Sequence, residues 1–172
     1  MDRLPRDLRR YQLKEKELRK LTDNLDAVLK EYALEKLVKG ARIELAQDEK
    51  FTVIFIDNKP AILRTSERPG FPVLSSEIAS HLPVVVVDMG AIAHVCSGAD
   101  VMVPGISSVE GNFERGSLVL VIDEKHHKPL AICRTLLSST EIEASERGKA
   151  AENLHFVGDS GWKLVQGLGA NI

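Results

Sequence analysis

The sequence predicts an α+β protein in which an N-terminal α/β module precedes a C-terminal pseudo-barrel with short helices. Three observations predict this fold class. One helical stripe fills most of the first 40 residues, the apolar period then changes from 3.6 to 2, and the later strands are short and separated by turn residues and glycines. With 172 residues, 44% of them apolar, the chain has enough apolar side chains for one domain or two small ones.

The N-terminal module contains one long helix followed by a hairpin. Apolar residues recur at three- and four-residue steps from Leu18 to Tyr32, which predicts a helix from about Glu15 to about Val38, and Gly40 is placed to end it. Turn residues Asp57–Pro60 lie between two β-rich segments and predict a hairpin. The other expected elements are strands at Tyr11–Lys14, Ala41–Leu45, Phe51–Ile56 and Ala61–Leu63 and a short capped helix near Ser75–Ile78.

The C-terminal block begins at Pro83 and is rich in strands. Asp88 can cap a short helix over Met89–Cys96, and Gly98 lies where that helix must stop. The expected strands are Val84–Val87, Val101–Val103, Leu118–Ile122, Pro129–Leu136, Leu154–Val157 and Trp162–Val165, with a second short helix near Ser139–Ile142. The blocks meet near Leu82 without a flexible linker, which predicts two domains, residues 1–81 and 82–172, packed together.

Charge is distributed unevenly along the chain. The total of 23 basic and 25 acidic residues gives −2, which by itself points away from nucleic acid. Residues 1–42 hold 12 basic and 8 acidic side chains, a sum of +4, whereas residues 82–172 hold 7 and 11, a sum of −4. The basic excess is therefore N-terminal.

The basic N-terminal stretch has two readings of equal weight. A positive field here favours phosphate contact, and the candidate residues are Arg3, Arg6, Arg9, Arg10, Lys14, Arg19 and Lys20. Alternatively the stretch is a solvated, salt-bridged surface, because Glu15 and Arg19 are four residues apart and Asp7 is close to Arg10.

The sequence shows no constellation typical of catalysis or metal binding. It has no G-x-S-x-G, H-E-x-x-H or P-loop motif, so we expect that the protein is not an enzyme and has no cofactor. The two cysteines, Cys96 and Cys133, form no C-x-x-C pair, and no metal-ligand spacing is recognisable. The apolar runs are strand-sized and the start lacks a signal-peptide pattern, so we expect a cytoplasmic protein without membrane contact.

The segment VVDMGAIAHVCSGADVMVPGI, residues 86–106, is the most specific motif in the chain. It resembles the opening of a PUA domain, an RNA-binding pseudo-barrel, in its order of strand, short helix, glycine and strand. Gly116–Val121 and Arg147–Phe156 continue the likeness. The preceding block, with its QLK start, long helix, hairpin and PGFPVL segment, resembles the pre-PUA domain of archaeal proteins of the malignant T-cell-amplified-sequence family.

The resemblance implies a function in translation. Eukaryotic members of that family act with the density-regulated protein on the small ribosomal subunit, so the implied partners are structured RNA, tRNA or ribosomal RNA, the small ribosomal subunit and a translation initiation factor. Two alternatives stay open: a protein-interaction adaptor for a translation factor, and an accessory RNA-binding subunit of an RNA-modification enzyme.

The PUA resemblance also implies where RNA lies, against the first short helix and the following strand. The implied contact residues are Gly90, Ala91, His94, Gly98, Ala99, Met102, Pro104 and Gly105, with Lys125, Lys128 and Lys149 as flanking cations. Small residues let a sugar-phosphate chain approach the backbone, although Gly90 and Gly98 can also serve only to shape the helix entry and exit. We expect a bulky residue at Gly98 to weaken RNA binding while leaving the fold largely intact.

Overall fold

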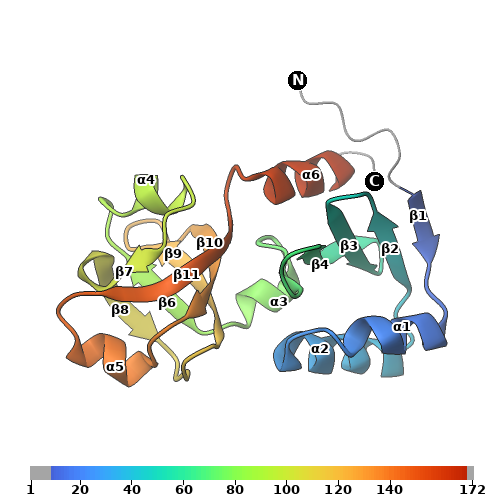
Figure 1. Cartoon of the computed structure of the whole chain (residues 1–172), viewed down its shortest axis with the longest axis horizontal. Coiled ribbons are helices and arrows are strands. Elements are labelled where there is room, and N and C mark those ends of the chain that lie inside the picture. The colour runs from blue at the N-terminus through green and yellow to red at the C-terminus, as the bar shows by residue number, and fades with distance from the viewer. Residues whose placement is uncertain (1–8, 170–172) are drawn as a thin grey trace. The chain divides into compact units, whose positions relative to one another are not determined.

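A computed structural model describes residues 9–169 and divides them into two compact units (Figure 1). The N-terminal unit comprises the described residues up to Ile78 together with those from Lys163 onward, and the C-terminal unit comprises Ala79–Trp162. The fold class predicted from the sequence is confirmed, since both units combine sheet with short helices. The predicted domain limits of 1–81 and 82–172 stay a prediction.

The N-terminal unit is a five-stranded antiparallel sheet in the order β1-β2-β3-β4-β5, with helices α1 and α2. Its elements are β1 (Arg9–Gln12), α1 (Glu15–Thr22), α2 (Ala27–Val38), β2 (Ile43–Gln47), β3 (Phe51–Ile56), β4 (Lys59–Thr65) and β5 (Phe71–Pro72). Gly70 lies where a side chain would collide, because a Cβ there would be 2.7 Å from Leu25 and 3.1 Å from Ile62. This close approach shows that the sheet face carrying Ile62 packs against the helical layer.

The hairpin predicted around Asp57 is confirmed, although its turn is shorter than the predicted Asp57–Pro60, since β4 begins at Lys59. Asp57 and Asn58 adopt φ values of 49° and 67°, and together they form a two-residue turn between β3 and β4. Positive φ at both central residues is the geometry that matches the twist of a tight hairpin, and Asp and Asn tolerate it better than most residues.

The long N-terminal helix predicted over Glu15–Val38 is interrupted, so that prediction was wrong in its middle. Helix α1 ends at Thr22, and the Asp26 carboxylate accepts a hydrogen bond from the Val28 N–H at 3.2 Å to begin α2. Asp26 therefore acts as an N-cap inside the predicted helix.

The C-terminal unit is a six-stranded mixed sheet in the order β7-β11-β10-β9-β6-β8, in which only the β6–β9 pairing is parallel. Its elements are β6 (Val84–Val87), α4 (Ile92–Val95), β7 (Val101–Met102), the 3-10 turn η1 (Val103–Gly105), β8 (Ile106–Glu110), β9 (Leu118–Asp123), β10 (Pro129–Thr135), α5 (Ser139–Ala144) and β11 (Lys149–Phe156). Two helices cross the limits of the units, α3 (Glu77–Ser80) and α6 (Ser160–Gly169).

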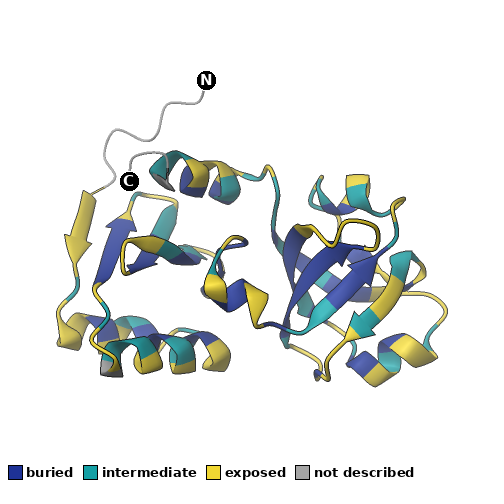
Figure 2. Ribbon diagram, turned by 180° about the vertical axis from the view of Figure 1, so that it is seen from behind, coloured by how far each residue is buried: buried dark blue, intermediate teal, exposed yellow. Residues whose placement is uncertain are grey.

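The sheet of the C-terminal unit curls around an apolar core formed by alternate strand residues, such as Val119 and Val121 of β9, which share one face of the sheet. Val85, Val119 and Ala131 are completely buried there. Figure 2 shows much of this sheet in dark blue, with exposed residues in turns, on helix surfaces and along the edge strand β8. The predicted pseudo-barrel is thus a curled sheet with β7 and β8 as its edges.

Two further expectations differ from the structure. The segment Trp162–Val165 is helical in α6 and was predicted as a strand. Asp159 accepts a hydrogen bond from the Trp162 N–H at 2.6 Å, as an N-cap does, and the buried residues Gly161, Leu164 and Val165 follow helical spacing. Strand β8, which the sequence analysis missed, is a half-exposed edge strand containing two serines.

Candidate nucleic-acid interface

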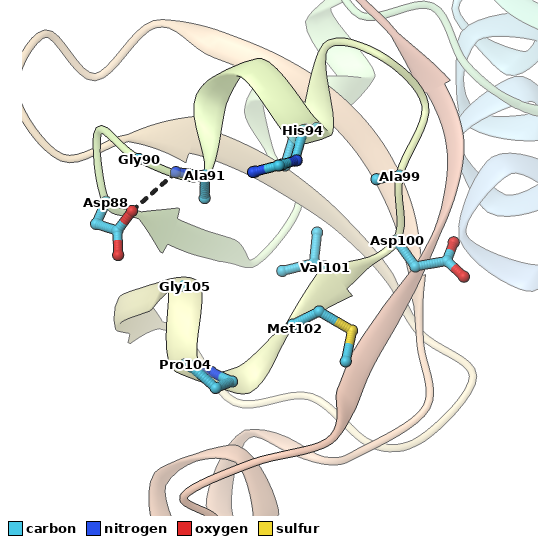
Figure 3. A pocket seen from close by; sticks show the side chains of 11 residues that line it. Asp88, Gly90, Ala91, His94, Ala99, Asp100, Val101, Met102, Pro104 and Gly105 are labelled. Atoms are coloured by element: carbon cyan, nitrogen blue, oxygen red, sulfur yellow. Dashed lines mark hydrogen bonds between the residues drawn. The ribbon is translucent and has the colours of Figure 1, made fainter.

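A pocket of about 520 Å³ lies between the α4 segment and the chain from β7 to η1 in the C-terminal unit (Figure 3). Its walls are largely apolar. The lining residues are Asp88, Gly90, Ala91, His94, Val95, Ala99, Asp100, Val101, Met102, Pro104 and Gly105. The pocket therefore lies within one continuous stretch of 18 residues, from Asp88 to Gly105.

One end of the pocket is closed by backbone and small side chains. Asp88 Oδ1 accepts a hydrogen bond from the Ala91 N–H at 2.8 Å, and the Asp88 N–H donates to the Gly105 carbonyl at 2.9 Å. A Cβ on Gly105 would lie 3.2 Å from the Cβ of Ala91, so a side chain there would make a tight contact with Ala91. The helix predicted over Met89–Cys96 with Asp88 as its cap is shorter, since α4 begins at Ile92 with Ala91 as its N-cap, and Asp88 instead closes the preceding turn and ties it to η1.

The other end of the pocket is held by Asn153 on β11, which is 7% exposed. Its side-chain amide donates to the carbonyls of Val95 and Ala99, at 3.0 Å each, and its backbone N–H donates to Asp100 Oδ1 at 2.9 Å. Asn153 thus fixes the loop between α4 and β7. The sequence analysis missed it, although a polar residue between apolar positions of a strand was a signal that could have been used.

The acidic residues at the pocket are engaged in local contacts. Lys149 Nζ lies 2.6 Å from Asp100 Oδ2, and this hydrogen bond raises the pKa of the lysine above its ordinary value. Lys149 pairs with Met102 across the β11–β7 ladder, which places the lysine beside the pocket wall. Asp100 is thus paired with a cation, whereas Asp88 accepts one backbone hydrogen bond and keeps its negative charge at the other end of the pocket.

A turn rich in cations lies near the Asp88 end. The β9–β10 turn contains Lys125 and Lys128, and the buried carboxylate of Asp123 accepts hydrogen bonds from the N–H groups of both. The neighbouring Glu124 accepts a hydrogen bond from the Met89 N–H at 3.3 Å, which fixes the turn against the start of the pocket segment. Lys125 and Lys128 are themselves exposed.

Seven of the eight residues predicted for the groove line this pocket, and Gly98 does not. Gly98 has a φ of 91°, and a Cβ there would lie 2.9 Å from the ring of Phe156. The expectation that a bulky residue at Gly98 leaves the fold largely intact was therefore wrong, because both the backbone conformation and Phe156 oppose a side chain. That these residues contact RNA stays a prediction.

The candidate phosphate contacts of the N-terminal unit are used in different ways. Arg10 donates to Glu44 at 2.7 Å and to Asn58 at 2.9 Å, and its guanidinium lies 4.1 Å from the centre of the Phe55 ring. Arg19 pairs with Glu15 at 2.8 Å, as the salt-bridge reading expected. The residues Arg9, Lys14 and Lys20 are exposed, and Arg3 and Arg6 lie outside the described residues.

Neither cysteine has the environment of a reactive thiol. Burial raises the pKa of both, and Cys133 is fully buried. Within residues 9–169, no three His, Cys, Asp or Glu side chains are grouped as metal ligands would be. None of the helices described has the length and apolar character needed to cross a bilayer.

Known proteins resemble both units of the chain. Residues 83–157 match the model of the PUA domain. An uncharacterized protein of Methanocaldococcus jannaschii is 36% identical over 159 residues, 91% of this chain and 96% of its own.

Translation-associated proteins are among the relatives. The Saccharomyces cerevisiae translation machinery-associated protein 20 is 28% identical over 76% of each chain, and proteins named malignant T-cell-amplified sequence 1 also match. Among solved structures, a PUA-domain protein of Aeropyrum pernix superposes with a TM-score of 0.75 at 26% identity, covering 94% of this chain and 93% of its own.

Proposed function

Because this chain belongs to the family of PUA-domain proteins that includes translation machinery-associated protein 20 and malignant T-cell-amplified sequence 1, we propose that it binds structured RNA in translation. The RNA is tRNA or ribosomal RNA, and the partners are the small ribosomal subunit and an initiation factor. This function places the protein in the cytoplasm. The observation that carries the proposal is the pocket between α4 and η1, whose walls are backbone and small apolar side chains.

The shape of the pocket suits an unstacked nucleotide. Proteins that read RNA sequence or ends commonly take up splayed-out bases by stacking and apolar contact. A volume of about 520 Å³ holds one such base with part of its sugar, and His94 and the 48%-exposed Met102 lie at its rim as stacking and apolar contacts. Around Gly90 and Gly105, the sugar-phosphate chain can approach the protein backbone closely.

Charge at this site is supplied by the flanking cations. Lys125 and Lys128 lie on the turn near one end and Lys149 lies near the other, so a bound strand meets positive side chains on both sides of the pocket. Because only these few cations are available, neutralisation of phosphates contributes a modest share of the affinity, and shape contributes the rest. The protein acts by recognition and performs no covalent step.

The proposal is tested by filling the pocket. Ala99 is exposed and lines the pocket, so we expect Ala99→Phe to occupy the space of the base and to weaken RNA binding at least tenfold in fluorescence anisotropy with tRNA and with small-subunit ribosomal RNA. Ala93→Phe is the matched control, because Ala93 is an exposed alanine on α4, the helix just before the Ala99 loop, and does not line the pocket.

Equal affinities for the two variants and the unchanged protein would overturn the pocket as the RNA site. Retention of a translation factor without any RNA affinity would instead favour the adaptor function. Co-purification with a modification enzyme in place of ribosomal subunits would favour an accessory subunit.

A further inference from the structure

Four polar side chains form a row across the N-terminal sheet. The antiparallel register places Arg9 opposite Gln47, Gln47 opposite Thr52, and Thr52 opposite Arg64. Directly opposed residues of antiparallel strands point to the same face, so these four side chains share one face of the sheet. The row joins β1, β2, β3 and β4 and has an arginine at each end, about 14 Å apart as three strand spacings.

The row borders a hollow of about 370 Å³ in the N-terminal unit. Gln47, Thr52 and Arg64 line this hollow, and the hydroxyl-bearing residues Thr65 and Ser66 lie beside Arg64 at the end of β4. The hollow therefore has a guanidinium, an amide and hydroxyl groups around one space, which is the set of donors that binds an oxyanion.

The contacts of Arg64 differ from those of its neighbour Arg10. Arg10 points to the opposite face of the sheet, where it is held by Glu44, Asn58 and the Phe55 ring. Arg64 is half-buried, yet within residues 9–169 its guanidinium forms no hydrogen bond or ion pair. A partly desolvated guanidinium without an acceptor is unfavourable, and a bound anion would supply the missing acceptor.

Two carboxylates also line the hollow, and their contacts limit how far they compete. Asp48 Oδ1 accepts hydrogen bonds from the N–H groups of Lys50 and Phe51, at 2.8 and 2.6 Å, so this carboxylate is occupied in closing the β2–β3 turn. Glu49 is exposed at the tip of that turn, and Lys50 lies next to it with its ammonium 5.2 Å from the centre of the Phe51 ring.

We propose that the row Arg9–Gln47–Thr52–Arg64 is a phosphate-binding site on the N-terminal unit, separate from the pocket of the C-terminal unit. The phosphate is presented either by an RNA backbone, which rests on the proposed function, or by a free phosphate group. Arg64 supplies the charge and the bidentate donors, Thr52 and Gln47 supply neutral donors, and Arg9 takes a neighbouring phosphate oxygen or the next phosphate of a chain.

The test compares Arg64→Gln with Lys59→Gln in the full chain. Both substitutions remove one positive charge from β4, and Lys59 is exposed at the opposite end of the strand, so it is the matched control. Addition of inorganic phosphate should shift the NMR amide signals of Thr52 and Ser66 saturably in the unchanged protein and in Lys59→Gln. The shift should be absent in Arg64→Gln. A Thr52→Val variant, which keeps the side-chain shape, should weaken the response without changing the fold.

RNA binding separates the two sources of phosphate. We expect Arg64→Gln to lower affinity for tRNA about tenfold and Lys59→Gln to change it less than twofold, because one charge-assisted contact is lost only in the first. A phosphate response without this loss assigns the site to a free phosphate. The phosphate site is ruled out, and the proposed function stands, if two results are found together. Phosphate shifts no signal in the row, and Arg64→Gln binds RNA normally while Ala99→Phe does not. If phosphate shifts the signals of the row but the unchanged protein binds no RNA, the phosphate site is supported and the proposed function is refuted.

Discussion

The pocket beside α4 and the polar row on the N-terminal sheet use their polar groups in opposite ways. At the pocket, Asp88 and Asp100 are engaged within the protein, and the open surface is glycine, alanine and apolar side chain. The row lies beside buried apolar residues such as Leu45 and Ile62, and Arg64 has its donors free of contacts with residues 9–169. On the two proposals, we therefore expect the pocket to select its ligand by shape and the row to select its ligand by charge.

The contacts that hold the residues of the two sites in place differ as well. The pocket depends on buried contacts that hold a short loop in place, with Gly98 and Asn153 behind it. The row depends on the regular ladder of three antiparallel pairings. A substitution behind the pocket should consequently damage its shape, while a substitution in the row should remove a charge and little else.

Gly98→Val should distort the loop behind the pocket and have the largest effect on stability of the variants considered. A valine at a φ of 91° is strained, and its Cβ would lie 2.9 Å from Phe156, so we expect the free energy of unfolding to fall by about 3 kcal/mol. Chemical denaturation measures the loss. Gly116→Val is the control, because Gly116 has a similar φ of 84° but nothing within 4 Å of a Cβ. Equal losses for the two variants would contradict a role for Phe156.

Asn153→Ala should loosen the pocket without a clash. The substitution leaves the carbonyls of Val95 and Ala99 without the donors of a buried amide, so we expect a loss of about 2 kcal/mol in unfolding free energy and a several-fold weaker affinity for RNA. Hydrogen exchange of the α4–β7 loop should accelerate. Ser97→Ala, which removes an exposed hydrogen bond to His94, should change stability by less than about 0.5 kcal/mol. An unchanged exchange rate in Asn153→Ala would show that the loop does not need this anchor.

Salt dependence should sharpen the contrast between shape and charge. Loss of one phosphate contact reduces the slope of log affinity against log salt by about 1, so Arg64→Gln should have a shallower slope than the unchanged protein. Ala99→Phe should weaken binding by a similar factor at every salt concentration and keep the slope. Binding isotherms between low and physiological salt measure both slopes, and parallel lines for all three proteins would remove the distinction between the sites.

Acid should reveal a smaller stabilising contact that belongs to the C-terminal unit alone. Arg115 and the Ser138 N–H hold the pKa of Glu141 at about 2, below its ordinary value of 4.5. Since the pKa is lower in the folded state, the contribution to stability is present above about pH 4.5 and is lost as the pH falls towards 2. The difference in urea midpoint between the unchanged protein and Glu141→Gln should therefore shrink from pH 7 to pH 3. A constant difference would show that Glu141 stabilises the fold in a way that does not depend on its charge.

The local chemistry of turns and caps explains what could be predicted from the sequence. Asp57 and Asn58 select a tight hairpin through their backbone preferences, and Asp88 closes the turn before α4 through a contact three residues away. Such features depend on neighbours in sequence, so a single chain reveals them. The pocket was predictable for the same reason, because Asp88–Gly105 is continuous and resembles a known motif.

The features that could not be predicted depend on contacts between residues distant in sequence, or on polar residues that act as helix caps within or next to apolar segments. Asp26 interrupts a continuous apolar stripe as an N-cap, and α6 begins because Asp159 caps a segment whose apolar residues also fit a strand. Asn153 serves the pocket from 54 and 58 positions away in the chain. The polar row depends on strand register, which apolar periodicity alone does not determine.

The ion pair between Asp100 and Lys149 has a consequence for the proposed RNA site, because Lys149 already has an anionic partner before a ligand binds. Asp100 is an internal competitor, because a phosphate must replace it at a lysine whose ammonium is 2.6 Å away. A small free anion brings only its charge to this exchange and gains little. On the proposed function, a nucleotide of an RNA chain would bring a base for the apolar wall and further phosphates for the flanking lysines, so we expect it to displace the carboxylate more readily than a free anion does. We therefore expect Asp100 to favour polymeric RNA over dissolved anions at this pocket.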